Sequence, residues 1–568
     1  MMNYLTSTAR GLWTYWSNGI GQLTSEDGSL LRYEIEERLA SQSDSLVSKA
    51  FQRQIDDSSL PRDDLLHFMI FARNIHMFFL QSHFTRITVL QARLFQSSER
   101  VDPKTPGAIS LSVFTIAITL QISLRLIASM LKSRMLRPLL QEPSEQTDGA
   151  TLVVPYFIGV SPNYRNDMFW LTRSTAERVG KVVLIGRSEK ELAAAKLQIG
   201  ELQAAWSQQG VSIPKIVTAS LYSAPTPGFF SSAQQALSLK IDSTKTGFLE
   251  RCLLRTCHLY YARHRDAYAY FLESSQAVAV TNTNLSFLNA AISGAALRSS
   301  SLSIFRERSV WGNWSRVHRN KIICDCFSAL SSTSKAFLEG SNPHITNIYE
   351  QEIQTLPHAV IREPQAPSSE RVFRILLLGS NISKNKTNFP PQVIPDAIAT
   401  RELGSFSKWA IIQEDLLVRI KEKKDGPAAR SIRSIVLESA DGGLDDTFSG
   451  WEETARITPH QFANDIDLAI AIGTFYPSAL HELTSLLPKE RCLFWDITGL
   501  TSKYPSIPDA APISVAESLE EVQAHILRLK ASEDIAARRE ASTNSGNFES
   551  WLLETLGEAP AFSNGLSA

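Results

Sequence analysis

The sequence predicts an α/β protein made of two doubly wound, Rossmann-like lobes that follow a helical N-terminal region. Short, β-rich apolar runs alternate with helical segments over 151–350, and the same alternation restarts over 371–531 after a proline-bearing linker. Strands that alternate with helices form parallel βαβ units, so a restart of the pattern indicates a second lobe. The last segment, 532–568, is predicted to be a helical or mobile tail.

The predicted strands are short runs rich in Val, Ile, Leu and aromatic residues. In the central lobe they are 151–158, 181–185, 277–280, 302–305, 321–324 and 344–348. In the C-terminal lobe they are 374–378, 416–420, 434–437, 468–472 and 492–495. Ligands of open α/β sheets bind outside the carboxyl ends of the strands, so the loops after these runs are the expected sites.

Residues 1–145 form the predicted helical N-terminal region, with helical apolar periodicity over about 30–96. The segment 105–124 carries no charge and has basic flanks, but Ser, Thr and Gln side chains dilute its apolar run. Three interpretations stay open: a buried helix, an interfacial helix with a basic edge, or a membrane span. The second would make the protein peripheral at the inner face of the cytoplasmic membrane.

The composition is that of a folded protein with balanced charge. The 568 residues include 57 Lys+Arg and 58 Asp+Glu, so the overall basic excess typical of nucleic-acid binders is absent. The five cysteines are an odd number without paired C-x-x-C spacing, which argues against a disulfide framework and a structural zinc site. We therefore expect a cytoplasmic protein with no nucleic-acid partner.

The sharpest candidate ligand loop lies in 467–482 (DLAIAIGTFYPSALHE). Its apolar strand ends in Gly473 and Thr474, and Ser478 begins a helix. A glycine lets the backbone approach a ligand, and the free N–H groups of a helix start favour phosphate. The alternative is an ordinary strand-turn-helix unit in which Ser478 is only an N-cap.

This loop and the next strand, in 491–503 (RCLFWDITGLTSK), resemble the nucleotide-binding half of bacterial surface-polysaccharide glycosyltransferases of the GT-B type. The likeness rests on a D-x-x-I-x-I-G strand, a small-residue helix start and a W-D-x-T-G-L strand end. The matching residues are Gly473, Ser478, Glu482, Trp495, Asp496, Thr498, Gly499 and Leu500. The sequence departs from the group at Phe475, Tyr476 and Pro477, where small polar residues are commoner.

The central lobe resembles the same group. In 154–174 (VPYFIGVSPNYRNDMFWLTRS) an aromatic-rich loop follows the first strand, and the match is carried by Tyr164, Arg165, Asn166, Asp167, Phe169 and Trp170. The segment 302–311 (LSIFRERSVW) resembles a later strand that ends near a Q-R-S element, with Glu307 interrupting the usual order. The matches together cover about 151–504.

The resemblance implies a metal-independent glycosyltransferase that moves a sugar from a nucleotide-sugar donor to a glycan or lipid-linked acceptor in surface-polysaccharide biosynthesis. The C-terminal lobe would bind the donor and the central lobe the acceptor. Two alternatives stay open. One is a sugar-nucleotide epimerase on the same scaffold. The other is a non-catalytic GT-B-like scaffold protein, which the departure at 475–477 favours.

Glycosyl transfer by inverting displacement needs a group that takes the acceptor proton and donors that hold the departing phosphate. Asp167 is the predicted base, because it lies in a loop after the first strand; an ion-paired or capping role is its alternative. The predicted catalytic residues are Asp167, Arg165 and Glu307, and His264 is a weaker candidate. Tyr164 and Trp170 are predicted to contact the acceptor.

The donor site is predicted from residues that follow the strands of the C-terminal lobe. Its members are Gly379, Ser380, Lys384, Arg419, Lys421, His460, Gly473, Thr474, Ser478, Glu482, Asp496 and Thr498. No D-x-D flanked by apolar strands is present, so we expect no essential metal and no cofactor besides the donor substrate. No G-x-x-x-x-G-K-[ST] occurs either, which excludes a P-loop ATPase.

Overall fold

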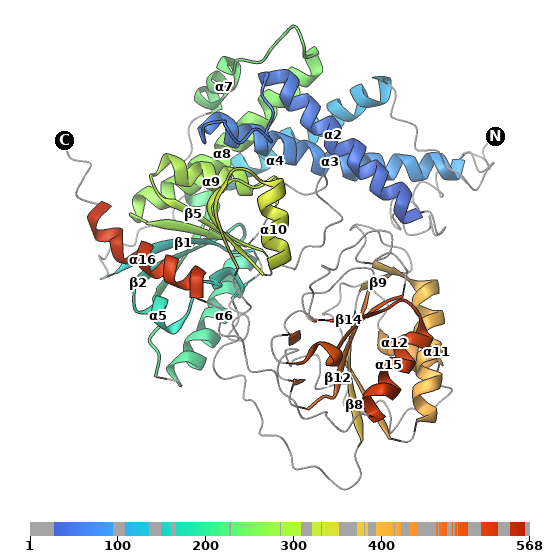
Figure 1. Ribbon diagram of the computed structural model, residues 1–568. Helices are drawn as coiled ribbons and strands as arrows, with labels where there is room; N and C mark the ends of the chain where they lie inside the picture. The colour runs from blue at the N-terminus through green and yellow to red at the C-terminus, as the bar shows by residue number, and fades with distance from the viewer. Residues whose placement is uncertain are drawn as a thin grey trace.

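The computed structural model describes most of the chain between residues 28 and 562. Within that span it leaves out 95–107, 136–148, 158, 161–165, 209, 226–228, 284–285, 308–320, 331, 351–371, 380, 384–392, 414, 422–431, 440–461, 464, 474–479, 481–482, 485–486, 498–512 and 532–545. The described residues form two parallel sheets with helices on their faces, together with a layer of N-terminal helices (Figure 1).

The central lobe is built on a seven-stranded parallel sheet with the order β3-β2-β1-β4-β5-β6-β7. Its strands are β1 (Ala150–Pro155), β2 (Val179–Gly186), β3 (Lys215–Ser220), β4 (Ala279–Asn282), β5 (Leu302–Arg306), β6 (Cys324–Ala329) and β7 (Ile345–Glu350). The order runs outward from β1 to β3 and then from β4 to β7 on the other side. The direction in which successive strands are added to the sheet therefore reverses between β1 and β4. This point is the topological switch point of a doubly wound fold.

Alternate residues of the central strands face two different cores, as expected for a sheet covered on both sides. Leu152 and Val154 of β1 pack into one core cluster, whereas Val153 packs into the other. The first cluster also holds α6 (Glu189–Ser207), and the second holds α8 (Phe248–Ser274) and α9 (Asn289–Arg298). The other described helices of the lobe are η2 (Asn166–Met168), α5 (Arg173–Ala176), η3 (Leu221–Ser223), α7 (Phe229–Ser238) and α10 (Ser332–Ser341).

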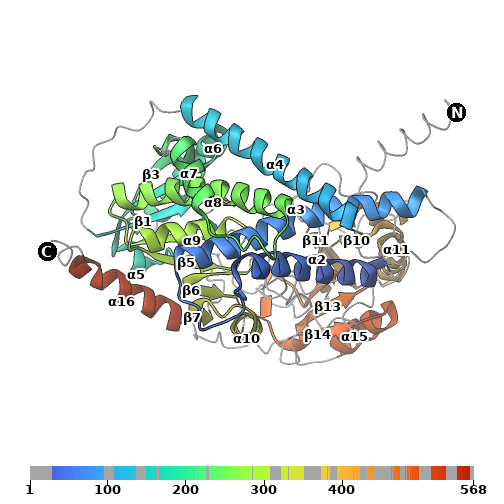
Figure 2. The ribbon, with the colours of Figure 1, turned by 90° about the horizontal axis from the view of Figure 1, so that it is seen from above.

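The N-terminal helices α2 (Gly28–Phe51), α3 (Asp64–Leu94) and α4 (Ala108–Met135) pack on the α8 and α9 side of the central lobe (Figures 1 and 2). Their apolar side chains belong to the same core cluster as α8, α9 and the sheet; Phe68 and Phe71 of α3 contact the ring of Tyr261 on α8. The helical region and the central lobe thus share one continuous core.

The C-terminal lobe is built on a five-stranded parallel sheet with the order β11-β8-β12-β13-β14. Its strands are β8 (Phe373–Leu378), β11 (Leu416–Lys421), β12 (Leu468–Gly473), β13 (Cys492–Asp496) and β14 (Ser514–Ala516), and a separate pair is formed by β9 (Asn381–Ser383) and β10 (Val393–Pro395). The flanking helices are α11 (Asp396–Ile412), α12 (Ile432–Ser439) and α15 (Leu519–Ala531), with a short turn η6 (Lys489–Arg491) before β13. The switch point lies between β8 and β12.

These two sheets confirm the predicted class of two doubly wound lobes. Two predicted strands differ from the structure: 321–324 overlaps β6 only at Cys324, and 434–437 lies inside helix α12. Among the helix residues whose burial is described, Ile432, Ile435 and Val436 are buried, and this spacing of three and four places them on one helix face. A run of three apolar residues fits a strand equally well, so the short pattern was ambiguous.

The last helix, α16 (Gly546–Phe562), returns to the central lobe (Figure 1). Phe548 lies 6.0 Å from the ring of Phe169, and Trp551 lies 5.6 Å from the ring of Tyr349 at the end of β7. Glu549 accepts a hydrogen bond from Thr172 Oγ1 at 2.7 Å. The chain therefore passes between the lobes twice, once from β7 to β8 and once from α15 to α16.

Candidate functional site

The carboxyl ends of the strands define the candidate site in each lobe. All pairings in the two large sheets are parallel, so each sheet has one carboxyl edge. Leu330, directly after β6, belongs to the same core cluster as Leu376 and Leu378 of β8. The carboxyl edge of the central sheet thus packs against the second lobe.

Asp167 lies at the switch point of the central sheet. Its Oδ2 atom accepts hydrogen bonds from the backbone N–H groups of Phe157 and Gly159, both at 2.8 Å, in the turn after β1. Its Oδ1 atom accepts a hydrogen bond from the hydroxyl of Thr283, after β4. The side chain is 1% exposed. Asp167 therefore ties together the two strands that flank the switch point.

Glu307 makes a similar connection further along the same edge. It follows β5, and its carboxylate accepts hydrogen bonds from Leu330 N and from Ser334 Oγ, both at 3.0 Å. Leu330 follows β6, and Ser334 lies in the first turn of α10. Glu307 is also 1% exposed. Two of the three predicted catalytic residues are therefore buried side chains that hold the carboxyl edge together.

Three further residues of the central lobe were predicted to act in catalysis or to contact the acceptor, and the structure describes only one of them. Tyr164 and Arg165 lie outside the described residues. Trp170 is 0% exposed and belongs to the core cluster that α16 covers. This burial argues against the predicted contact of Trp170 with an acceptor, because the indole ring has no surface to offer.

Four predicted donor-site residues lie at the carboxyl edge of the second sheet. Gly379 directly follows β8 and its N–H donates to the carbonyl of Lys421, the last residue of β11, at 2.9 Å. Gly473 ends β12 and is paired with Asp496, which ends β13. Since β8 and β12 flank the switch point, Gly379 and Gly473 stand on its two sides. Asp496 itself is completely buried.

Arg419 and Lys421 share one face of β11. Both are half-buried. Val418, before Arg419, and Ile420, between the two cations, face the other way and are buried. The alternation predicted from the sequence is confirmed. The other predicted donor-site residues lie outside the described part of the chain: Ser380, Lys384, His460, Thr474, Ser478, Glu482 and Thr498.

The sequence did not point to a group of cationic and aromatic side chains at the carboxyl ends of β2 and β3. We call it the arginine cluster; it consists of Arg187, Tyr222, Tyr260, Arg263 and His264. Arg187 follows β2 and lies over the ring of Phe157 at 4.7 Å, and Tyr222 lies in η3 after β3. The other three come from α8. Of its members only His264 was named from the sequence, as a weaker catalytic candidate, and Arg187 follows the predicted strand 181–185 after Gly186.

His264 is the most unusual member of the arginine cluster. It is 6% exposed, and among the described residues neither ring nitrogen has a hydrogen-bond partner. Burial lowers the pKa of His264 to about 3, and the charges of Arg263 and Arg187 act in the same direction. The ring packs edge-on against Tyr260 at 4.7 Å. The imidazole is therefore neutral at neutral pH and lies close to the guanidinium groups of Arg263 and of Arg187, the second of which is paired with the carboxylate of Glu191 at 3.1 Å.

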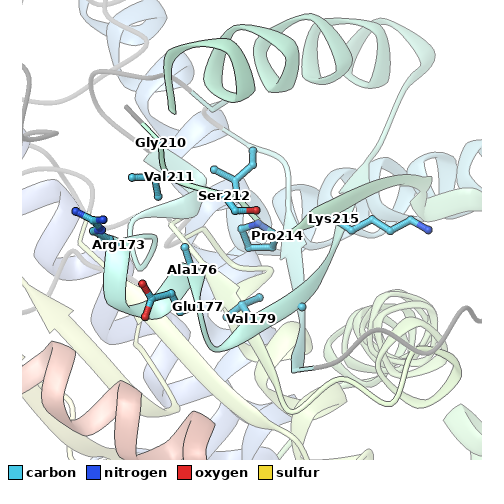
Figure 3. A pocket seen from close by; sticks show the side chains of 11 residues that line it. Arg173, Ala176, Glu177, Val179, Gly210, Val211, Ser212, Pro214 and Lys215 are labelled. Carbon is cyan, nitrogen blue, oxygen red and sulfur yellow. The ribbon is translucent and has the colours of Figure 1, made fainter. Parts of the chain in front are cut away.

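A cavity of about 460 Å³ lies at the opposite edge of the central sheet (Figure 3). It is lined by the first residues of β2 and β3, including Val179 and Lys215, and by Arg173 and Glu177 of the α5 turn. Ligands of doubly wound sheets bind at the carboxyl edge, so we do not assign the site to this cavity. Within the described residues, no group of three or more His, Cys, Asp or Glu side chains could hold a metal ion.

No family model matches the chain, and no curated protein matches its sequence. Solved structures that resemble it include MurG from Acinetobacter baumannii, 10% identical, with 72% of this chain and 99% of that chain covered and a TM-score of 0.39. A putative UDP-N-acetylglucosamine 2-epimerase from Listeria monocytogenes is 11% identical, with 73% and 98% covered and a TM-score of 0.38. The UDP-GlcNAc 2-epimerase from Neisseria meningitidis, bound to UDP-GlcNAc, is 11% identical, with 72% and 100% covered and a TM-score of 0.39. These TM-scores are below 0.5, so the assignment of two doubly wound lobes rests on the two sheets themselves.

Proposed function

We propose that the protein is a glycosyltransferase that binds a nucleotide sugar at the C-terminal lobe and transfers the sugar to an acceptor at the central lobe. The observation that carries this proposal is the position of Gly379, Lys421 and Gly473. All three lie at the carboxyl edge of the second sheet, and the two glycines flank its switch point. A nucleotide diphosphate requires a backbone that it can approach closely, which glycine provides, and a cation nearby to pair with its charge.

In the proposed reaction the bond from the sugar to the nucleotide diphosphate breaks, and a bond from the sugar to an acceptor oxygen forms. The nucleotide leaves as its diphosphate, and the acceptor loses a proton. The burial of Asp167 and the hydrogen bonds that it accepts from Phe157, Gly159 and Thr283 favour a positioning role over the predicted role as base. Asp167 would hold the turn after β1, from which the loop carrying Tyr164 and Arg165 continues.

The arginine cluster supports an acceptor that carries a negative charge. Its cations lie at the carboxyl edge of the central sheet, where the acceptor is proposed to bind. We propose that the phosphate of a lipid-linked acceptor, or an acidic group of a glycan, lies against this cluster.

Ligand-induced stabilisation tests the donor site. Thermal unfolding of the full chain would be followed with UDP, GDP, CMP and TDP sugars, and a ligand at about 100 times its Kd stabilises the protein by about 2.7 kcal/mol. The Lys421→Gln variant is expected to need about ten times more ligand for the same stabilisation, because one charge-assisted contact is lost. Lys408→Gln, on the exposed face of α11, is the matched control. Unchanged unfolding with every nucleotide sugar would overturn the proposal.

Turnover separates the transferase from its two alternatives. A transferase releases nucleotide rapidly only when an acceptor is present. An epimerase converts the free nucleotide sugar without any acceptor, and nuclear magnetic resonance of the sugar detects the change. A scaffold protein that has kept the site but lost turnover binds the nucleotide sugar and does neither.

A further inference from the structure

Helix α4 presents a continuous apolar stripe to its surroundings. The α4 stripe consists of Val113, Ile116, Leu120, Leu124, Ile127 and Leu131, each between 45% and 67% exposed. The intervals of three and four residues place all six on one face of the helix, over a length of about 27 Å. Among the described residues, six of the fifteen large apolar side chains with high exposure lie on this single helix. Such a concentration marks an interaction surface.

The opposite face of α4 is packed against the protein. Phe114, Ile118, Ile122 and Leu126 are at most 7% exposed and belong to the core that α4 shares with α3 and α8. Figure 2 shows α4 along the outer edge of the molecule, with α8 on its inner side. By length and composition alone, Ser112–Ser133 could cross a membrane. Because one face is buried along the lobe, α4 fits a helix that lies flat on a surface.

The charges of α4 distinguish between possible occupants of the stripe. The helix contains Arg125, Lys132 and Arg134 and no Asp or Glu. Two copies of α4 packed stripe to stripe would bring these cations together without opposite charges from the helix itself. Anionic lipid headgroups complement them, and long basic side chains beside an apolar face extend to the headgroup level.

We propose that α4 lies in the interface of a membrane that contains anionic lipids, with the α4 stripe among the acyl chains. The helix is joined to the candidate site at its C-terminal end. Lys132 lies over the ring of Tyr222 at 5.4 Å, and the Oγ atoms of Ser129 and Ser133 accept hydrogen bonds from Arg263. The membrane would then lie beside the arginine cluster, at the carboxyl edge of the central sheet.

Vesicle flotation of the full chain tests the proposal. The protein is mixed with vesicles of phosphatidylcholine, or of phosphatidylcholine with about a third phosphatidylglycerol, at low and high salt. We expect binding to the anionic vesicles, weakened by salt. The triple variant L120Q/L124Q/I127Q is expected to reduce the bound fraction about tenfold, because three apolar side chains leave the acyl layer. K132Q is expected to reduce the preference for anionic vesicles.

The matched control is L197Q/L297Q/L527Q, which changes three similarly exposed apolar residues on α6, α9 and α15. It should bind vesicles as the unchanged protein does. Both triple variants alter exposed side chains, so the unfolding temperature reports whether each is folded. The proposal is overturned if the unchanged protein floats with neither vesicle, or if the control loses binding equally. A stable dimer that the stripe variant alone dissociates, without vesicle binding, would identify a second copy as the occupant.

This inference does not depend on the proposed transferase activity. Vesicle binding is measured without nucleotide sugar, and nucleotide-induced stabilisation is measured without lipid. Failure of one experiment therefore leaves the other proposal standing.

Discussion

The carboxylate of Asp167 and the hydroxyl of Thr283 form a hydrogen bond between residues 116 positions apart in the sequence. The bond joins the chain just after β1 to the chain just after β4. These two strands flank the switch point, where the strand order of the central sheet reverses. The same carboxylate binds two backbone N–H groups of the turn after β1. One buried side chain thus fixes the geometry of the central switch point.

Replacement of Asp167 by alanine should destabilise the central lobe strongly. Asp167→Ala leaves the N–H groups of Phe157 and Gly159 without their acceptor, and we expect a loss of about 2–4 kcal/mol in the free energy of unfolding. Asp167→Asn keeps one oxygen for these donors and should cost less. Urea denaturation measures both. Equal stability of the alanine variant and the unchanged protein would contradict this role of the carboxylate.

Gly294 of α9 should not tolerate a side chain. A Cβ atom there would lie 2.4 Å from the hydroxyl oxygen of Tyr261, which is fully buried and donates to Asp64 at 2.7 Å. Gly294→Ala is therefore expected to lower the free energy of unfolding by about 1–3 kcal/mol. Gly200→Ala is the control, since nothing lies within 4 Å of its Cβ position in α6.

The control should be neutral or stabilising by up to about 1 kcal/mol, because alanine favours a helix more than glycine does. Tyr261→Phe removes the clashing oxygen, so the double variant with Gly294→Ala should lose less than the two single losses added together. Additive losses, measured by thermal unfolding of all four proteins, would show that the clash with Tyr261 is not the cause.

The stability of the protein should fall between about pH 6.5 and pH 4. Burial lowers the pKa of His67 and of His76 to about 4, and that of His264 to about 3. As the pH falls below 6.5, the unfolded chain binds protons on these imidazoles that the folded chain does not, so the unfolded state is favoured. One imidazole with a pKa of about 4 lowers the free energy of unfolding by about 3 kcal/mol at pH 4.

His76→Gln isolates one of these contributions. Glutamine can still bind the hydroxyl of Ser43, which lies 2.9 Å from His76 Nδ1, but it does not titrate. The stability difference between the variant and the unchanged protein should shrink as the pH is lowered from 7 to 4. If chemical denaturation gives the same difference at every pH, burial of His76 does not govern the acid response.

The docking of α16 should contribute to the stability of the central lobe. Leu552 is buried in the cluster that this helix shares with Phe169 and Trp170, and Leu552→Ala is expected to cost about 2–5 kcal/mol. Glu554→Ala, on the exposed face of the same helix, should change stability by no more than about 0.5 kcal/mol. Calorimetry would show a lowered transition for the leucine variant only. Equal effects of the two substitutions would mean that α16 does not stabilise the lobe by burying this face.

The sheets were predictable because a strand covered on both faces is a continuous apolar run. The runs 374–378 and 468–472 lie in β8 and β12, and Gly473 ends its strand as predicted. The strand predicted at 434–437 was not separable from helix α12, since three apolar residues fit both patterns. The position of the predicted donor site at the carboxyl edge of the second sheet follows from parallel pairing alone, because Gly379 and Gly473 both come at the ends of buried strands.

The candidate site of the central lobe was less predictable, because its environment comes from distant segments. Trp170 is covered by α16, which begins at Gly546, far later in the chain. His264 is buried among residues of β2 and α8, and no local pattern distinguishes a buried histidine of a helix from an exposed one. Burial of polar side chains is decided by which elements pack over them, and a single sequence does not specify that packing.

The return of α16 to the central lobe makes the C-terminal lobe an insertion in the chain, because residues of the central core lie on both sides of it in the sequence. A protein truncated after α15 would therefore lose Phe548, Leu552 and Leu556 from that core. Such a truncation removes part of the central lobe and not merely a terminal extension.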